Sequence, residues 1–161
     1  MMGAGKSHWA SQLAAYFGVH FFDTDHMIEK NVGKTIADIF KEEGGEERFR
    51  NFEKQLMGET QWPESCFVSC GGGLPCFHDN MNKLLYTGRV VWLNPDVEEL
   101  VNRIWYEKQK RPLVAASENR EELRERVTKL LVQREDIYCK AHITIDLPVP
   151  TLQDLLKALK T

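Results

Sequence analysis

The sequence lacks the features that mark several large classes of protein. No apolar run approaches the roughly 20 residues of a membrane span or forms the core of a signal peptide. None of the four cysteines forms a C-x-x-C pair, and the set Cys66, Cys70, Cys76 and His78 fits no standard zinc spacing. The formal net charge is -3 and no long basic run occurs, which disfavours nucleic acid as a partner. These absences predict a cytoplasmic enzyme with reduced cysteines that lie buried or line strands.

What is present fits a single α/β domain. The chain has 161 residues, enough for a sizeable core without metal or disulfides, and contains no repeat or linker. Short β-type runs predict strands at 20–22, 66–70, 89–93 and 143–145. Helical periodicity and capping residues predict helices at 8–17, 35–41, 46–57, 94–106, 120–138 and after Thr151. The alternation predicts a parallel sheet flanked by helices, with a ligand crevice at the carboxyl ends of the strands.

Two details of these helices are expected from local pattern. Trp9, Leu13 and Tyr16 recur at helical spacing, so we expect all three to face inward. Asn94 suits an N-cap and Pro95 the first helical position, so we expect the fourth helix to begin there. The polar segment of about residues 108–120, which feeds a long helix, has the character of a mobile lid.

The chain opens on the end of a phosphate-binding loop, G-x-x-x-x-G-K-[ST]. Backbone N–H groups from Gly3, Ala4 and Gly5 through His8 would surround phosphate oxygens. Lys6 would reach the outer phosphates, and the Ser7 hydroxyl would ligate Mg²⁺. The first glycine of the pattern and the apolar strand before it are absent from the sequence. We expect either that the chain given starts late or that its sheet lacks that strand.

Two acidic residues, Asp23 and Asp25, follow the strand predicted at 20–22. Alternation along a strand would send both carboxylates to one side. The strand at 66–70 ends in glycine, so we assign the Mg²⁺ water shell to Asp23. Asp25 is left to accept a hydrogen bond or proton from a substrate hydroxyl. The alternative is that both are solvated turn residues.

A glycine loop and three arginines complete the candidate site. Gly71, Gly72 and Gly73 follow a predicted strand, where a loop without side chains lets the backbone touch a ligand. Arg50, with Glu53 three residues on, could bind an anion or form a surface ion pair. Arg111 in the lid and Arg134 in the long helix could reach phosphates or a carboxylate, or be solvated charges. Together these residues supply what phosphoryl transfer needs.

In order and spacing, these residues resemble the shikimate kinases over nearly the whole chain. The resemblance rests on four patterns besides the phosphate loop: D-x-D at 23–25, F-R-x-x-E at 49–53, G-G-G at 71–73 and R-P-L at 111–113. It implies a P-loop kinase fold of the nucleoside monophosphate kinase type, a three-layer sandwich with a helical lid. Residues 1–161 would form one kinase domain, with substrate-binding helices at about 26–58 and the lid at about 108–120.

The resemblance also implies an activity and a set of roles. ATP, with one Mg²⁺ per site, would phosphorylate the 3-hydroxyl of shikimate on the route to aromatic amino acids. Residues 3–8 and Arg111 would bind ATP, with Lys6, Asp25 and Arg111 catalytic. Asp25 would hold shikimate hydroxyls, Arg50 and Arg134 its carboxylate, and the loop 71–73 would approach it through Gly72. The enzyme is expected to be a monomer with no nucleic acid or membrane partner.

Three rival interpretations stay open at this point. Another small-molecule P-loop kinase, acting on gluconate or a nucleoside monophosphate, would share the loop and lid arginines but is not expected to carry the other patterns together. A GTP-dependent switch would need an N-K-x-D motif, and the segment beginning at Asn82-Lys83 lacks its aspartate. A catalytically impaired homologue that only binds ligand is the third.

Overall fold

The computed structural model describes residues 1–160, which fall into two compact units. The N-terminal unit is Gly5–Lys83. The C-terminal unit combines Met1–Ala4 with the chain from Leu84 onward. One boundary between the units therefore falls within the phosphate loop, between Ala4 and Gly5.

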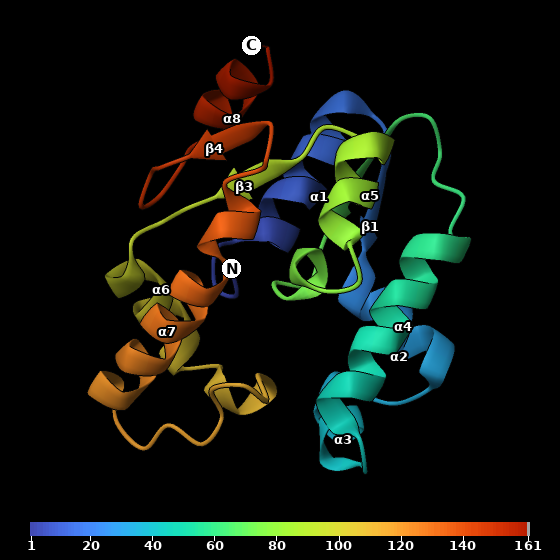
Figure 1. Cartoon of the computed structure of the whole chain (residues 1–161). Coiled ribbons are helices and arrows are strands. Elements are labelled where there is room, and N and C mark those ends of the chain that lie inside the picture. Colours follow the sequence, from blue (N-terminus) through green and yellow to red (C-terminus); the bar gives the residue numbers. More distant parts are fainter. Residues whose placement is uncertain (161) are drawn as a thin grey trace. The chain divides into compact units, whose positions relative to one another are not determined.

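The N-terminal unit is built around two parallel strands and four helices (Figure 1). Its elements are α1 (Lys6–Phe17), β1 (His20–Asp23), α2 (Thr24–Val32), α3 (Ile36–Lys41), α4 (Gly45–Glu59), β2 (Cys66–Ser69) and the 3-10 turn η1 (Leu74–Cys76). β1 pairs with β2 in parallel, with His20 opposite Cys66 and Asp23 opposite Ser69. Both strands therefore end at the same level, which brings the residues that follow them together.

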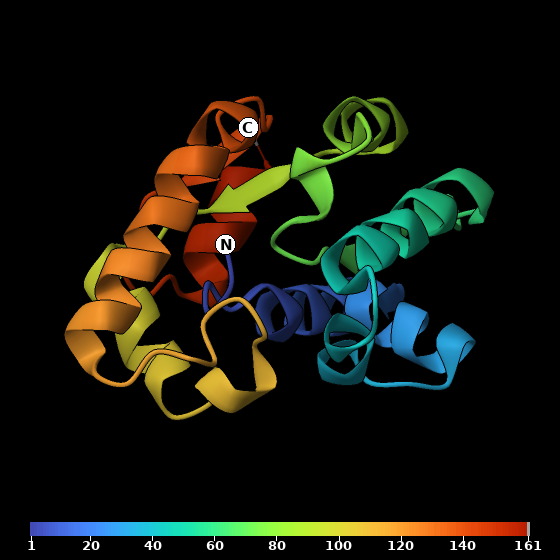
Figure 2. The same cartoon turned by 60° about the horizontal axis from the view of Figure 1, so that its bottom comes forward.

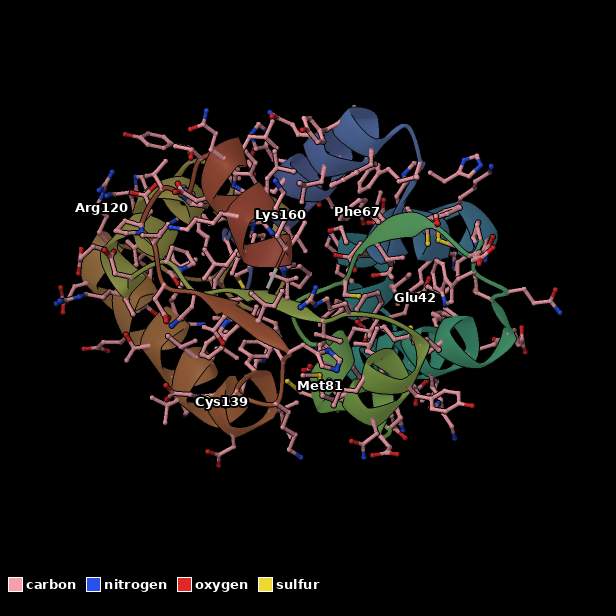
Figure 3. The ribbon with its side chains drawn as sticks, turned by 90° about the horizontal axis from the view of Figure 1, so that it is seen from above. Glu42, Phe67, Met81, Arg120, Cys139 and Lys160 are labelled. Atoms are coloured by element: carbon pink, nitrogen blue, oxygen red, sulfur yellow. The ribbon has the colours of Figure 1, made fainter. Side chains whose placement is uncertain are left out.

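Apolar faces of three helices form the core of this unit. Ile28 of α2, Ile39 of α3, and Phe49 and Leu56 of α4 are all buried in one cluster. On the other side of the strands, the Phe67 ring, labelled in Figure 3, stacks on Phe17 of α1 with ring centroids 5.9 Å apart. These contacts pack α2, α3 and α4 on one another and pack α1 on β2.

The C-terminal unit also contains two parallel strands, together with one long helix and shorter helices. Its elements are β3 (Val91–Leu93), α6 (Val97–Trp105), the 3-10 turn η2 (Lys108–Lys110), α7 (Arg120–Tyr138), β4 (Ile143–Ile145) and α8 (Leu152–Leu159). The boundary between the units falls within α5 (Asn80–Thr87), which carries the buried Met81 (Figure 3). α6 and α7 lie side by side (Figures 1 and 2) and bury Ile104 and Leu123 completely. β3 pairs with β4, with Val91 opposite Ile143.

Most of the predicted elements are confirmed. All four strands form within a residue or two of their expected bounds, and both pairings are parallel. The long helix has the predicted bounds 120–138, and Thr151 with Asp154 forms a capping box on α8. The strands pair as β1 with β2 and β3 with β4 across residues 1–160. In the same residues, no helix combines the length and apolarity that crossing a bilayer would need.

Two local predictions are wrong. Tyr16 is 60% exposed, because Leu13 and Ala14 carry the buried side of α1. α6 begins at Val97, since the Asp96 carboxylate accepts from Glu99 N–H and caps it. Asn94 instead donates its backbone N–H to the Ile145 carbonyl and extends the β3–β4 ladder.

The expectation for the cysteines also needs one correction. All four are free thiols, as predicted, and Cys66, Cys70 and Cys76 are at least partly buried. Cys139, which directly follows α7 and is labelled in Figure 3, is exposed. It is the C-cap of α7, and a residue that ends a surface helix has no core to enter.

Two glycines of α4 provide a matched test of how closely this helix approaches Phe40. A Cβ on Gly45 would lie 2.3 Å from the carbonyl oxygen of Phe40, whereas a Cβ on Gly58 would meet nothing within 4 Å. We expect Gly45→Ala to destabilise the protein by about 1–3 kcal/mol through forced backbone movement. Gly58→Ala should stabilise it by up to ~1 kcal/mol through helix propensity. Thermal unfolding of both variants checks this; equal shifts of the two would contradict the close approach of α4 to Phe40.

Candidate active site

The phosphate loop has the backbone that its glycines predict. Gly3 and Gly5 adopt left-handed φ angles of 73° and 82°, which side chains other than glycine rarely take. Gly5 is the N-cap of α1, and its carbonyl accepts from Trp9 N–H at 3.0 Å. Among the described residues no side chain caps α1, and its first turn holds no acidic residue. The positive end of the α1 dipole therefore stays open to an anion.

The remaining loop residues differ in their surroundings. Ala4 is buried, with 1% of its surface exposed. His8 is exposed, and its Nε2 lies 3.1 Å from the Gln12 amide nitrogen. The His8 side chain thus turns along α1, which leaves its backbone N–H as the group suited to a phosphate.

Ser7, Asp23 and Ser69 form a small polar cluster where the two strands meet α1. The Ser7 hydroxyl donates to Asp23 Oδ2 at 2.6 Å and lies 3.0 Å from the Ser69 hydroxyl. Asp23 Oδ1 caps α2 by accepting from the backbone N–H groups of Asp25 and His26. The two oxygens of Asp23 therefore have different tasks, one in α2 and one facing Ser7.

This cluster fits a magnesium ion of the kind that nucleotides bring. Within residues 1–160 no three His, Cys, Asp or Glu side chains gather into a metal cage. Mg²⁺ bound with nucleotides needs only one or two protein oxygens, because phosphates and water supply the rest. The Ser7 hydroxyl and Asp23 Oδ2, adjacent in the structure, supply that number.

Alternation along a strand predicted that Asp23 and Asp25 share one face, and the structure contradicts this prediction. The chain leaves β1 at Asp23 and turns into α2 at Thr24, so Asp25 lies in the first helical turn. Thr24 points inward instead, fully buried, and its hydroxyl accepts the Gly71 backbone N–H at 2.9 Å. The strand ends at Asp23 because this residue caps α2. From Thr24 onward the side chains follow the helical repeat instead of alternating between the two faces of a strand.

The Asp25 carboxylate still points into the candidate site. Its Oδ1 is buried and has no hydrogen-bond partner among the described residues. Burial raises the pKa of Asp25, and the nearby Lys6 ammonium opposes this only in part. An unpartnered buried carboxylate oxygen beside a cation is suited to accept a hydrogen bond from a hydroxyl group of a ligand.

Glycine is required at two positions of the loop 71–73, because the backbone there lies close to the side chains of Asp25 and Arg50. A Cβ on Gly71 would lie 2.4 Å from Asp25 Oδ1, and one on Gly73 would lie 2.5 Å from Arg50 Nη1. Gly73 has an ordinary φ of -85°, so the missing side chain matters there and the backbone freedom does not. Gly72, between them, is half-buried. The loop thus packs its backbone directly on Asp25 and Arg50.

Arg50 is buried in α4 between two carboxylates, which overturns its interpretation as a surface ion pair. It donates from Nη1 to Glu53 at 2.8 Å and from Nη2 to Glu46 at 2.8 Å. Burial alone would lower the pKa of Arg50, but the charge and hydrogen bond of Glu53, helped by Glu46, leave it raised. The guanidinium stays charged, and its buried Nε has no hydrogen-bond partner within residues 1–160.

The other two predicted arginines belong to the C-terminal unit. Arg111 directly follows η2 in the predicted lid, and its Nη2 lies 3.5 Å from Glu107. Its Nε is buried and unpartnered among the described residues. Arg134 is buried in α7, where Nη1 donates to the Met1 sulfur at 3.9 Å. The N-terminal unit thus gathers Lys6, Ser7, Asp23, Asp25, Arg50 and the loop 71–73, and the C-terminal unit holds Arg111 and Arg134.

Three polar residues of this region escaped the sequence analysis. Glu46 lies four residues before Arg50, a spacing that could have revealed the ion pair. Thr24 was passed over as the spacer between two aspartates, and Ser69 as part of an apolar strand. The contacts of Thr24 and Ser69 depend on the parallel register of β1 and β2, which no local pattern encodes.

Comparison with known proteins agrees with this arrangement. The family model for shikimate kinase matches residues 2–154. The shikimate kinase of Parabacteroides distasonis is 41% identical over 90% of this chain and 83% of its own. That of Azobacteroides pseudotrichonymphae is 37% identical over 98% of this chain and 92% of its own.

Solved structures give the same result. Shikimate kinase from Acinetobacter baumannii in complex with shikimate superposes with a TM-score of 0.88 at 32% identity, covering 99% of this chain and 86% of that one. The enzyme from Bacteroides thetaiotaomicron superposes with a TM-score of 0.79 at 27% identity, covering 99% and 94%. The fold is that of the P-loop kinases, and the chain belongs to the shikimate kinase family of ATP-dependent kinases.

Proposed function

We propose that this protein transfers the γ-phosphate of ATP to the 3-hydroxyl of shikimate. The observation that carries the proposal is the buried, unpartnered Oδ1 of Asp25 in contact with the glycine loop that also packs on Arg50. A hydroxyl acceptor beside a buried cation suits a ligand that has both hydroxyl groups and a carboxylate. The Acinetobacter baumannii enzyme, which binds shikimate, supports the same substrate.

We infer the roles of the residues from their positions. The backbone from Gly3 to His8 and the open N-terminus of α1 bind the ATP phosphates, and Lys6 neutralises charge on the transferring group. Asp25 orients the attacking hydroxyl and accepts its proton. Arg50 binds the shikimate carboxylate, and the loop at Gly71–Gly73 lets the ring approach the backbone.

The C-terminal unit contributes the other two charged groups. Arg111 acts on ATP from the lid, where its buried Nε is available to a phosphate oxygen. Arg134 shares the substrate carboxylate with Arg50. Ser7 and Asp23 would hold one Mg²⁺, Asp23 through water, and the ion would supply positive charge against the phosphates. The enzyme works as a cytoplasmic monomer, as one kinase domain with helices 26–58 at the substrate and the lid at 108–120.

Two alternatives have specific consequences. A kinase for gluconate or for a nucleoside monophosphate would consume ATP with those acceptors. A catalytically impaired homologue would bind ligand without turnover. The buried pairing of Arg50 with Glu53 beside Gly73 favours an acceptor that carries a carboxylate over a nucleoside monophosphate, because it provides a preformed cation beside the glycine loop.

Release of ADP measured with and without shikimate tests the proposal directly. We expect turnover only when shikimate, ATP and Mg²⁺ are all present. Gluconate and nucleoside monophosphates, supplied at the same concentration, are the control acceptors. Turnover with one of them and none with shikimate would contradict the proposed substrate, and no turnover with any acceptor would favour the impaired homologue.

A pair of substitutions separates the substrate hydroxyl from the nucleotide. Asp25→Asn keeps the shape but removes the acceptor charge, so we expect kcat to fall by about 10²–10⁴-fold with little change in ATP affinity. Lys6→Ala should weaken both turnover and ATP binding. Steady-state kinetics and calorimetric titration with a nonhydrolysable ATP analogue measure the two effects. A similar loss of ATP affinity in both variants would show that Asp25 acts on the nucleotide.

The raised pKa of Asp25 predicts opposite effects of pH on activity and stability. Asp25 must be ionised to accept a proton, so kcat/KM should fall on the acid side at a pH above the ordinary value of 3.8. The folded protein binds this proton more tightly than the unfolded chain does, so the stability contribution is present below pH 3.8 and is lost as pH rises through the raised pKa. Asp25→Asn removes that loss.

Thermal unfolding from pH 4 to pH 8 therefore checks the same group independently of turnover. The difference in Tm between Asp25→Asn and the wild type should increase as pH rises through the raised pKa of Asp25 and stay constant above it. Asp38→Asn is the matched control, since the pKa of that exposed residue is lowered by its hydrogen bond to Thr35 and the sign is reversed. An Asp25→Asn variant that is less stable at neutral pH would contradict the burial of an ionised carboxylate.

A further inference from the structure

The buried guanidinium of Arg50 lies over two aromatic rings. Its Cζ lies 4.4 Å from the centroid of the Phe77 ring and 5.3 Å from that of Phe49. Phe49 is the neighbour of Arg50 in α4, whereas Phe77 comes from the segment after the glycine loop, 27 residues further along the chain. The closer of the two rings is therefore supplied by the loop and not by the helix.

A ring on the face of a guanidinium fixes its plane without using its hydrogen bonds. All N–H donors of arginine lie in the plane of the group, and an aromatic face attracts the cation from above. Glu53 and Glu46 take one donor each at Nη1 and Nη2, and Nε has no partner among the described residues. Phe77 thus restrains the tilt of the group while donors remain for a ligand anion.

The segment that carries Phe77 is held in an unusual backbone conformation. Phe77 is extended, with φ -125° and ψ 153°, and the next two residues, His78 and Asp79, have left-handed φ angles of 52° and 61°. Consecutive left-handed residues other than glycine are disfavoured, and such a turn persists only where its surroundings hold it. Asn80 does so here: it is fully buried and donates to the Leu74 carbonyl at 3.1 Å.

We propose that Phe77 is a positioning residue for substrate binding, which sets the plane of Arg50 so that its free donors meet the carboxylate of shikimate. The inference rests on the proposed function and adds a residue that lies outside the motifs of the resemblance. Gly73 completes the arrangement, because any side chain there would displace the guanidinium from the Phe77 ring.

The test compares three substitutions of Phe77 with a matched control. Phe77→Tyr keeps the aromatic face, Phe77→Leu keeps apolar volume without it, and Phe77→Ala removes both. Phe52→Ala is the control, since Phe52 also lies under an arginine of α4, with Arg48 Cζ 5.7 Å from its centroid. Steady-state kinetics with shikimate and with its methyl ester give KM and kcat for each variant, and thermal unfolding confirms that each is folded.

We expect KM for shikimate to rise by about 5- to 30-fold in Phe77→Ala and Phe77→Leu, as loss of a desolvated cation–π contact implies. KM for ATP and kcat should stay within about twofold, and Phe77→Tyr should restore KM. Because the ester has no negative charge for Arg50, the preference for shikimate over its ester should shrink in the same two variants. Phe52→Ala should keep both KM and this preference.

Two results would overturn the inference. An unchanged KM in folded Phe77→Leu would show that the ring does not act on the carboxylate site. An equal loss for shikimate and for the ester would show that Phe77 only shapes the cavity. Either result leaves wild-type turnover intact and so differs from failure of the proposed function, in which the wild type itself would not phosphorylate shikimate.

Discussion

The buried ion pair between Arg50 and Glu53 is the constraint on which the substrate side of this structure depends. Glu53 is fully buried, and removing its partner would leave an uncompensated charge in the core. The pair must therefore stay formed, and the elements around it adapt to the guanidinium. The loop is glycine at position 73 for this reason, and Phe77 turns back over the same group.

The same ion pair explains how the Arg50 guanidinium stays charged although it is buried. Burial works against the charge of Arg50, and the two carboxylates restore it. Glu53 is inaccessible, whereas the Glu46 side chain is 45% exposed and can exchange its hydrogen bond with water or an anion. The guanidinium is thus anchored on one side and adjustable on the other, which suits reversible binding of a carboxylate.

Much of this fold follows from the sequence because its signals are local. Apolar periodicity located α4 and α7, and the Thr151 and Asp154 pair located the start of α8. The errors arose where two local rules compete. Asp96 outcompeted Asn94 as a cap, and the cap at Asp23 ended a strand that the alternation of two would have continued.

The candidate site was predictable as an inventory and not as a set of contacts. The phosphate loop, the acidic pair and the glycines each carry a recognisable chemistry, so their residues could be named. The hydrogen bond from the Gly71 N–H to the Thr24 hydroxyl joins residues 47 positions apart in the chain. The contact between Phe77 and Arg50 joins residues 27 positions apart. Such contacts depend on strand register and on the left-handed turn at His78 and Asp79. Residues other than glycine are disfavoured in this conformation, so residue propensities would not predict the turn at this position.

The most strained features of the N-terminal unit converge on one small region. An unpartnered carboxylate oxygen at Asp25 and a buried charge at Arg50 border the loop 71–73, and a left-handed pair at His78 and Asp79 follows shortly after it in the chain. Each one costs folding free energy, and the apolar cluster of Ile28, Ile39, Phe49 and Leu56 on the adjoining helices offsets it. Because an ideal fold would avoid all three features, their coincidence beside one loop is better explained by ligand binding than by packing.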